Sequence, residues 1–146
     1  MTDQLTLDPA ANLDTLVGDI LMGRAGPWPL LGKPHGLLGL LRDHKGARRA
    51  RPLGEIAAHL KMQPRDVKAA VKSLVEDFGL PIGASRQQPF GYFLCVTPED
   101  MEDAIRPLVH EIESLARRVR VLGGERRLAE IFGQMRLRES GGVASE

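Results

Sequence analysis

The sequence predicts a mainly α-helical protein with one small β-hairpin and a long C-terminal helix. Apolar residues recur at helical spacing in four segments before residue 79, two short strand-like segments follow, and a seven-residue apolar repeat begins near residue 101. The chain has 146 residues, of which 42% are apolar and 27% charged, as in ordinary globular proteins. We therefore expect one globular domain with helical extensions.

The N-terminal segment, residues 1–35, is expected to hold one amphipathic helix and a connector. The helix has Asn12 as its N-cap, and its apolar residues are spaced i, i+3, i+4, i+7 and i+8: Leu13, Leu16, Val17, Ile20 and Leu21. Three prolines and three glycines lie within the twelve residues 25–36, which predicts an irregular connector. Trp28 in this connector is expected to pack onto the body, and a stacking role is the weaker alternative.

Two short helices and an arginine-rich loop are expected next. The first helix buries Leu37, Leu38, Leu40 and Leu41 and ends at a left-handed C-cap, Gly46. The loop "ARRARP" follows, with Arg48, Arg49 and Arg51 available at the surface. The second helix lies in "PLGEIAAHLKM" and carries its apolar residues on one face: Leu53, Ile56, Ala57 and Leu60.

A basic helix is expected over residues 64–78. Pro64 suits its first position, and Gly79 ends it. One face is apolar and is expected to be buried: Val67, Ala70, Val71 and Leu74. The opposite face carries Arg65, Lys68, Ala69 and Lys72.

A β-hairpin is expected after Gly79. Its strand candidates are "LPIGAS" at residues 80–85 and "FGYFLCV" at residues 90–96, joined by the turn "RQQP". If these strands pair, Arg86 and Gln87 lie at the hairpin tip.

The net charge of +1 conceals a basic central segment. Residues 31–72 carry ten cations against three acids, whereas residues 1–30 and 73–146 each have a net charge of −3. A compact basic segment is typical of a surface that binds a polyanion. Charge alone does not decide between this reading and the solvated face of amphipathic helices.

Residues 36–96 contain one characteristic set of positions: Leu53, Glu55, Ile56, Ala57, Leu60, Met62, Val67, Val71, Leu74, Gly79 and "GYFL" at 91–94. This pattern resembles the winged helix-turn-helix family, in particular small bacterial and phage modules similar to the N-terminal domain of the biotin-operon repressor. The repressor's ligase-like body has no counterpart in this chain, so no biotin chemistry is carried over.

This resemblance implies that the helix at 64–78 is a recognition helix in the major groove of DNA, and that residues 86–89 form the wing tip. Arg65, Lys68, Ala69 and Lys72 would then face DNA, with Arg65 the best candidate to read a base. Arg48, Arg49 and Arg51 are better suited to phosphate contacts, and Arg86 and Gln87 would approach the backbone from the wing. Some winged helices bind proteins instead, so the fold does not settle the function.

A long helix is expected from Thr97, its N-cap, with Pro98 and Asp100 in the first turn. Steps of four and three form a heptad seam over three repeats: Met101, Ile105, Leu108, Ile112, Leu115, Val119 and Leu122. The β-branched a positions favour a parallel two-stranded coiled coil, and hence a homodimer. Pro107 inside the helix, and Val109 and Ala116 beside the seam, fit packing on the chain's own domain instead.

After Gly123-Gly124 we expect a short amphipathic helix within the extension that spans residues 97–138, followed by a disordered tail over 139–146. We expect no catalytic residues, metal site or cofactor. His35, His44, His59 and His110 lack ligand spacing, and Cys95 is expected to be buried and inert. No apolar run is long enough to span a bilayer, so the cytoplasm, and for a DNA-binding protein the nucleoid, is the expected location.

The function expected from the sequence is binding of double-stranded DNA by a homodimer, as a transcriptional regulator or a phage-type accessory factor. The alternative is a protein-interaction adaptor that uses the winged helix and the long helix to assemble a larger complex.

Overall fold

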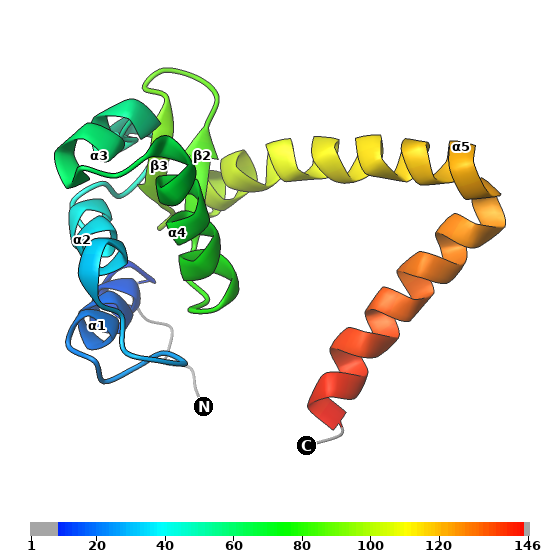
Figure 1. The fold of residues 1–146 in the computed structure, drawn as a ribbon, viewed down its shortest axis with the longest axis horizontal. Helices are drawn as coiled ribbons and strands as arrows, with labels where there is room; N and C mark the ends of the chain where they lie inside the picture. The colour runs from blue at the N-terminus through cyan, green and yellow to red at the C-terminus, as the bar shows by residue number, and fades with distance from the viewer. Residues whose placement is uncertain (1–8, 145–146) are drawn as a thin grey trace. The chain divides into compact units, whose positions relative to one another are not determined.

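The computed structural model describes the backbone of residues 9–144 and the side chains of residues 12–139. In chain order, the elements are the helices α1 (Pro9–Leu21) and α2 (Gly32–Leu41), the 3-10 turn η1 (Ala47–Arg49), the helices α3 (Leu53–Leu60) and α4 (Pro64–Glu76), the strands β2 (Ile82–Ser85) and β3 (Gly91–Leu94), and the helix α5 (Pro98–Ala144) (Figure 1). The mainly helical class, with a small antiparallel sheet and a long C-terminal helix, is therefore confirmed.

Two compact units divide the chain, Met1–Ile105 and Arg106–Glu146. The first contains α1 to α4, the hairpin and the first turns of α5. The second contains the rest of α5. No helix between residues 9 and 144 combines the length and apolar character that a bilayer span requires.

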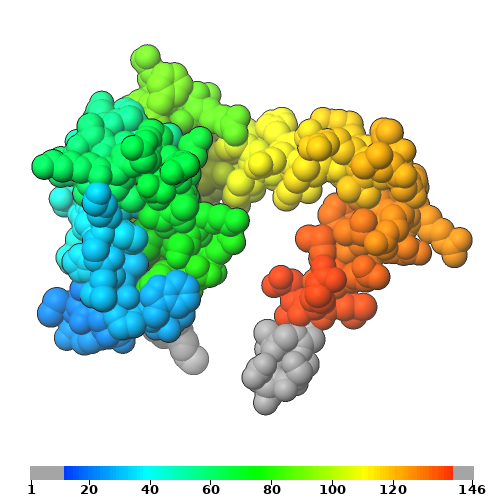
Figure 2. Space-filling view, viewed as in Figure 1, coloured from blue at the N-terminus to red at the C-terminus, as the bar shows by residue number. Residues whose placement is uncertain are grey.

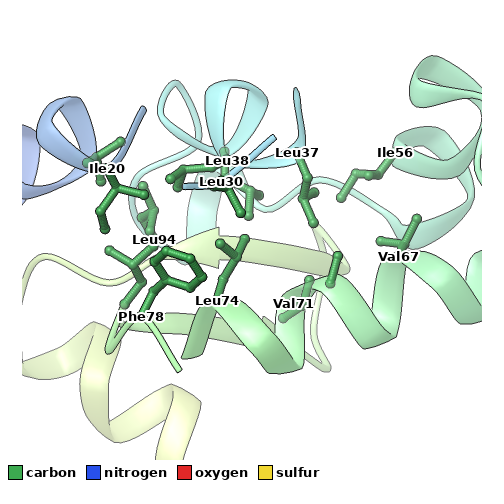
Figure 3. Close-up of a cluster of buried hydrophobic side chains, with 14 of the residues drawn as sticks. Ile20, Leu30, Leu37, Leu38, Ile56, Val67, Val71, Leu74, Phe78 and Leu94 are labelled. Atoms are coloured by element: carbon green, nitrogen blue, oxygen red, sulfur yellow. The ribbon is translucent and has the colours of Figure 1, made fainter. Parts of the chain in front are cut away.

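The larger of two clusters of buried residues in the described part of the first unit has α4 at its centre, and the smaller consists of Ala50, Phe93 and Cys95. The apolar side of α4 faces α2 and α3, and Figure 3 shows Val67, Val71 and Leu74 directed at side chains from these helices and from α1. The largest fully buried side chains of the core come from five elements and the turn after α4: Val17, Ile20, Leu37, Leu38, Leu41, Ile56, Val67, Leu74, Leu80 and Leu94. The N-terminal helix thus shares its core with the segment that follows residue 36.

The start of α1 differs from the sequence prediction. The helix begins at Pro9, so Asn12 lies inside it and is exposed rather than acting as the N-cap. Proline is tolerated in the first turn because its missing N–H would have no intrahelical partner there. Leu13, Val17 and Ile20 are buried as expected, but Leu16 is exposed.

The connector before α2 is shorter than predicted. Gly32 starts α2, so residues 32–36 are helical rather than irregular. Pro34 causes no break because it falls in the first turn, where the N–H groups are free in any helix. Leu40 is only half-buried, and Gly46 is not the C-cap, since α2 ends at Leu41.

Gly46 belongs instead to the approach to η1. It has a φ of 89°, and its N–H donates to the carbonyl of Leu94 at 2.8 Å. Trp28 packs edge-on against Phe78, with ring centroids 5.4 Å apart, which agrees with its expected packing onto the body. The basic helix ends two residues earlier than predicted, at Glu76, and Gly79 follows with a φ of 71°.

The hairpin pairs Ile82 with Leu94 and Ser85 with Gly91, so both strands are shorter than their sequence candidates. Arg51 adds an isolated antiparallel bridge on the other side of β3. Its N–H donates to Tyr92 at 2.8 Å, and the N–H of Tyr92 donates back at 2.9 Å. The segment after η1 therefore extends the sheet, which a local sequence pattern does not reveal.

Helix α5 starts as predicted. The Thr97 hydroxyl accepts a hydrogen bond from the N–H of Asp100 at 3.0 Å, and the Asp100 carboxylate accepts one from the N–H of Thr97 at 3.1 Å. This reciprocal pair is a capping box with aspartate in place of the usual glutamate. The helix continues through Pro107, and its non-helical residue is Gly124, with a φ of 84°.

Helix α5 extends to Ala144, into the segment 139–146 that was expected to be a tail, and residues 145–146 lie outside the described part. Once a helix is nucleated, each added residue gains a hydrogen bond for one fixed pair of dihedrals, so a polar segment can prolong it.

Gly91 is a position where backbone atoms of another segment leave no room for a side chain. Its φ is 123°, and a Cβ placed there would lie 1.9 Å from the carbonyl oxygen of Arg51. The close approach results from the bridge between Arg51 and Tyr92. Glycine at 91 is thus required both by the backbone angle and by the neighbouring chain.

We predict that Gly91→Ala destabilises the protein on the order of 3 kcal/mol, because the new methyl group must displace backbone as well as adopt a positive φ. Gly39→Ala is the matched control. A Cβ at Gly39, inside α2, would meet nothing within 4 Å, so this substitution should stabilise by about 0.5–1 kcal/mol. Urea unfolding monitored by circular dichroism measures both. Equal stability of the two variants would contradict the close packing at Gly91.

Candidate nucleic-acid interface

The outer face of α4 presents the cations expected from the sequence. Arg65, Lys68, Ala69 and Lys72 are all exposed, because Val67, Ala70, Val71 and Leu74 take up the side of the helix that faces the core. None of the three cationic side chains hydrogen-bonds or pairs with another described residue. Their charges are therefore free to meet an external anion.

The N-terminus of α4 lies beside Arg65. Gln63 is the N-cap residue, and its side chain makes no capping hydrogen bond. The first-turn N–H groups carry the positive end of the helix dipole, which attracts phosphate and adds to the charge of Arg65. Asp66, in the same turn, opposes this attraction in part.

Arg48 and Arg49 form the second group of cations. Both are exposed on η1, which packs against β2 and β3. A buried carboxylate fixes the start of this turn: Asp100 accepts hydrogen bonds from the N–H of Ala47 at 3.4 Å and of Val96 at 3.0 Å. The first turn of α5 thus positions the arginine loop, although 53 residues separate Ala47 from Asp100.

Burial of Asp100 opposes its ionisation, but the hydrogen bonds outweigh that effect. The N–H groups of Val96, Thr97 and Ala47 and the Thr97 hydroxyl together lower the pKa of Asp100 below its ordinary value. The carboxylate is therefore charged at neutral pH. It accepts backbone hydrogen bonds from the start of η1 and from the residues that precede α5.

Arg51 is less available than Arg48 and Arg49. Its Nε lies 3.0 Å from Glu55 Oε1, its Nη1 lies 3.4 Å from His44 Nε2, and its side chain is 27% exposed. A phosphate would have to compete with Glu55 for this guanidinium. We therefore expect Arg51 to contribute less to an interface than its two neighbours in the loop.

Arg86 and Gln87 lie at the hairpin tip and are exposed. Figure 2 shows the tip standing out from the body of the first unit. The hydroxyl of Ser85 donates to the carbonyl of Gln87 at 2.7 Å and accepts from its N–H at 3.3 Å, which orders the loop from within. Neither the Arg86 nor the Gln87 side chain pairs with another described residue.

The hairpin is the element that these groups share. Helix α4 contacts β2, and η1 contacts both strands. The cations of α4, of η1 and of the tip therefore project from elements that pack on one hairpin. The charge distribution along the sequence indicates these groups of cations, and the common packing on the hairpin comes from the tertiary contacts.

Lys61 was not among the site residues expected from the sequence. It is exposed at the turn between α3 and α4 and has a φ of 56°. Its carbonyl accepts a hydrogen bond from the Lys33 ammonium, so a residue from α2 supports the turn. The position of Lys61 only three residues before Pro64 was the available signal.

The heptad seam of α5 is largely exposed. Six of its seven residues have exposed fractions from 38% to 87%, and Val119 is half-buried: Met101, Ile105, Leu108, Ile112, Leu115, Val119 and Leu122. These apolar side chains are therefore in contact with solvent along most of the seam. The seam therefore remains a predicted dimerisation surface.

Cys95 offers no nucleophile. The residue is buried, and burial, followed by the charges of Asp100 and Asp103, raises its pKa to about 11. Thiolate is the reactive form, and its fraction at neutral pH is very small.

Comparison of the chain with protein-family models, with curated proteins and with solved structures found no match.

We predict that Asp100→Asn destabilises the protein by about 1–2 kcal/mol at neutral pH, because the amide replaces a carboxylate that accepts several backbone hydrogen bonds. Since the folded pKa of Asp100 is lowered, the advantage of the native residue is full above the unfolded pKa of about 4 and is lost as the pH falls through the folded pKa. Urea unfolding across this pH range measures the difference.

Glu99→Gln is the control for Asp100→Asn, because Glu99 is the exposed neighbour in the same helical turn. A pH-independent effect of Asp100→Asn would contradict the assigned role of the carboxylate.

Proposed function

We propose that the chain binds double-stranded DNA through a winged helix-turn-helix domain, as a dimeric transcriptional regulator or a phage-type accessory factor. In this proposal α3 and α4 form the helix-turn-helix, α4 is the recognition helix, and the loop between β2 and β3 is the wing. The single observation that carries the proposal is the outer face of α4, where three cations remain unpaired while the opposite face is fully used by the core.

The distribution of the remaining cations supports the same ligand. Arg48 and Arg49 lie on η1, which packs on the same hairpin as α4, and Arg86 lies at the tip of that hairpin. DNA presents two rows of phosphates beside its major groove, so a helix in the groove needs cations on the elements next to it. In this arrangement Arg65 approaches base edges, and Lys68 and Lys72 contact phosphates.

The protein-interaction adaptor remains the second candidate because α5 exposes a long apolar face. An adaptor would retain a stable partner in a pull-down from its own host, and nuclease treatment would leave that complex intact. A DNA-binding protein would lose nucleic-acid-dependent partners under the same treatment.

We predict that Lys68→Glu/Lys72→Glu weakens binding to duplex DNA on the order of 100-fold at moderate salt, because two attractions to phosphate become repulsions. The magnitude of the slope of log affinity against log salt concentration should also fall by roughly 1.8, the value for the loss of two phosphate contacts. Fluorescence anisotropy with a labelled duplex measures both quantities.

The matched control is Arg136→Glu/Arg138→Glu, which changes the net charge by the same amount at exposed residues of α5. This variant should retain most of the affinity. If both double variants lost affinity equally, net charge rather than the α4 face would govern binding. If neither lost affinity in a folded protein, the DNA proposal would be wrong.

We further predict that selection from a random duplex pool at moderate salt enriches a two-fold symmetric motif, because a symmetric dimer reads two half-sites. Sequencing of the retained duplexes gives the half-sites and their spacing in one experiment. Retention without a motif would replace the regulator with an architectural or replication role. No retention would favour the adaptor.

A further inference from the structure

Helix α5 carries an apolar face wider than a simple coiled-coil seam. In the heptad, Ile112 and Val119 occupy a positions and Leu108 and Leu115 occupy d positions. The e positions between them are also apolar, namely Val109 and Ala116. Parallel dimers usually place charged residues at e, where they pair with g of the other helix.

The charges of the same stretch are divided between its two ends. Glu111 and Glu113 lie in residues 108–113, which hold no Lys or Arg, whereas Arg117, Arg118 and Arg120 lie in residues 114–120, which hold no acid. Within the described residues, neither Glu111 nor Arg118 forms an ion pair. A parallel partner would place like charges side by side, and an antiparallel partner would place opposite charges side by side.

The heptad positions give the register of such a pair. Antiparallel helices match a residues with d residues of the partner, so Leu108 faces the partner's Val119 and Ile112 faces the partner's Leu115. The g residues then meet, which brings Glu111 to the partner's Arg118 twice by symmetry. The e residues also meet, which brings Val109 to the partner's Ala116. In the parallel arrangement Glu111 would face Ala116 and Arg118 would face Gly123, with no ion pair formed.

The centre of this register lies between Glu113 and Ser114, which is also where the acidic stretch gives way to the basic one. Pro107 falls at a c position, on the side of the helix away from the partner. The apolar pattern and the charge division therefore agree on the antiparallel arrangement, and Pro107 obstructs neither orientation. The exposed fractions of Leu108, Ile112 and Leu115, from 50% to 55%, leave this face open in the single chain.

We propose that the apolar face of α5 between Leu108 and Val119 binds a second copy of this chain in antiparallel orientation, with Glu111 paired to the partner's Arg118. This inference rests on the dimer of the proposed function but not on DNA binding. The proposed dimer keeps the pair of helices expected from the sequence. Its antiparallel orientation replaces the parallel one that the β-branched a positions favour.

Disulfide trapping in a glutathione buffer, without DNA, separates the two orientations. Leu108→Cys and Val119→Cys are made as single variants of the full chain. In the antiparallel dimer Leu108 and the partner's Val119 share a layer, so a mixture of the two single variants forms a covalent dimer. Each variant alone forms none, because its two cysteines lie about 16 Å apart along the axis. A parallel dimer gives the reverse, with each single variant cross-linking to itself.

Covalent dimer from either single variant alone would overturn the proposal in favour of a parallel pair. Absence of any covalent dimer would also overturn it and would leave the face to a different protein, as in the adaptor. The unsubstituted chain is the control for Cys95, whose buried thiol should not cross-link. Because no DNA is present, none of these outcomes depends on whether the chain binds DNA.

Charge reversal provides the second test. Glu111→Arg and Arg118→Glu should each raise the dimer dissociation constant by about five-fold or more, because each places like charges together at two symmetric sites. The double variant should regain most of the lost affinity. Glu113→Arg, at an outward b position, is the matched control. Analytical ultracentrifugation measures all four, and failure of the double variant to recover would contradict the pairing of Glu111 with Arg118.

Discussion

Burial of one side of α4 is the constraint on which the rest of the first unit depends. Four apolar residues of this helix fill the space between α2 and α3, and two of them, Val67 and Leu74, are fully buried. Because the helix repeats every 3.6 residues, this burial fixes which side chains point outward. The basic face of α4 is thus a consequence of the core and cannot rotate away without losing it.

Local pattern was sufficient where a helix is amphipathic. The periodicity of apolar residues identified α3, α4 and the start of α5, and the capping residues Thr97 and Asp100 were read correctly. It was insufficient at the starts of α1 and α2, because a proline that removes a hydrogen bond in a helix interior is harmless in the first turn. Pro9 and Pro34 lie in the first turns of their helices. The spacing of apolar residues does not reveal whether a proline is in the first turn or in the interior of a helix.

The candidate site shows the same division. Exposure of Arg65, Lys68 and Lys72 follows from the helical pattern alone. The low availability of Arg51 does not follow from that pattern. Its backbone forms a bridge with Tyr92 of β3, and its guanidinium binds Glu55 of α3. The link between Ala47 and Asp100 is also nonlocal, and no pattern of neighbouring residues signals it. Sequence therefore identified the cations, and tertiary contacts decided which of them are free.

The shared carboxylate of Asp100 has a consequence for the order of synthesis. It serves η1 and the start of α5, and the two segments lie far apart along the chain. Domains fold from the N-terminus as the ribosome releases them. A nascent chain that ends before Thr97 lacks the group that fixes Ala47, so the arginine loop of a ribosome-bound intermediate would be unanchored although its neighbouring helices are complete. Protease protection of η1 in chains stalled before and after residue 100 would show whether anchoring waits for that carboxylate.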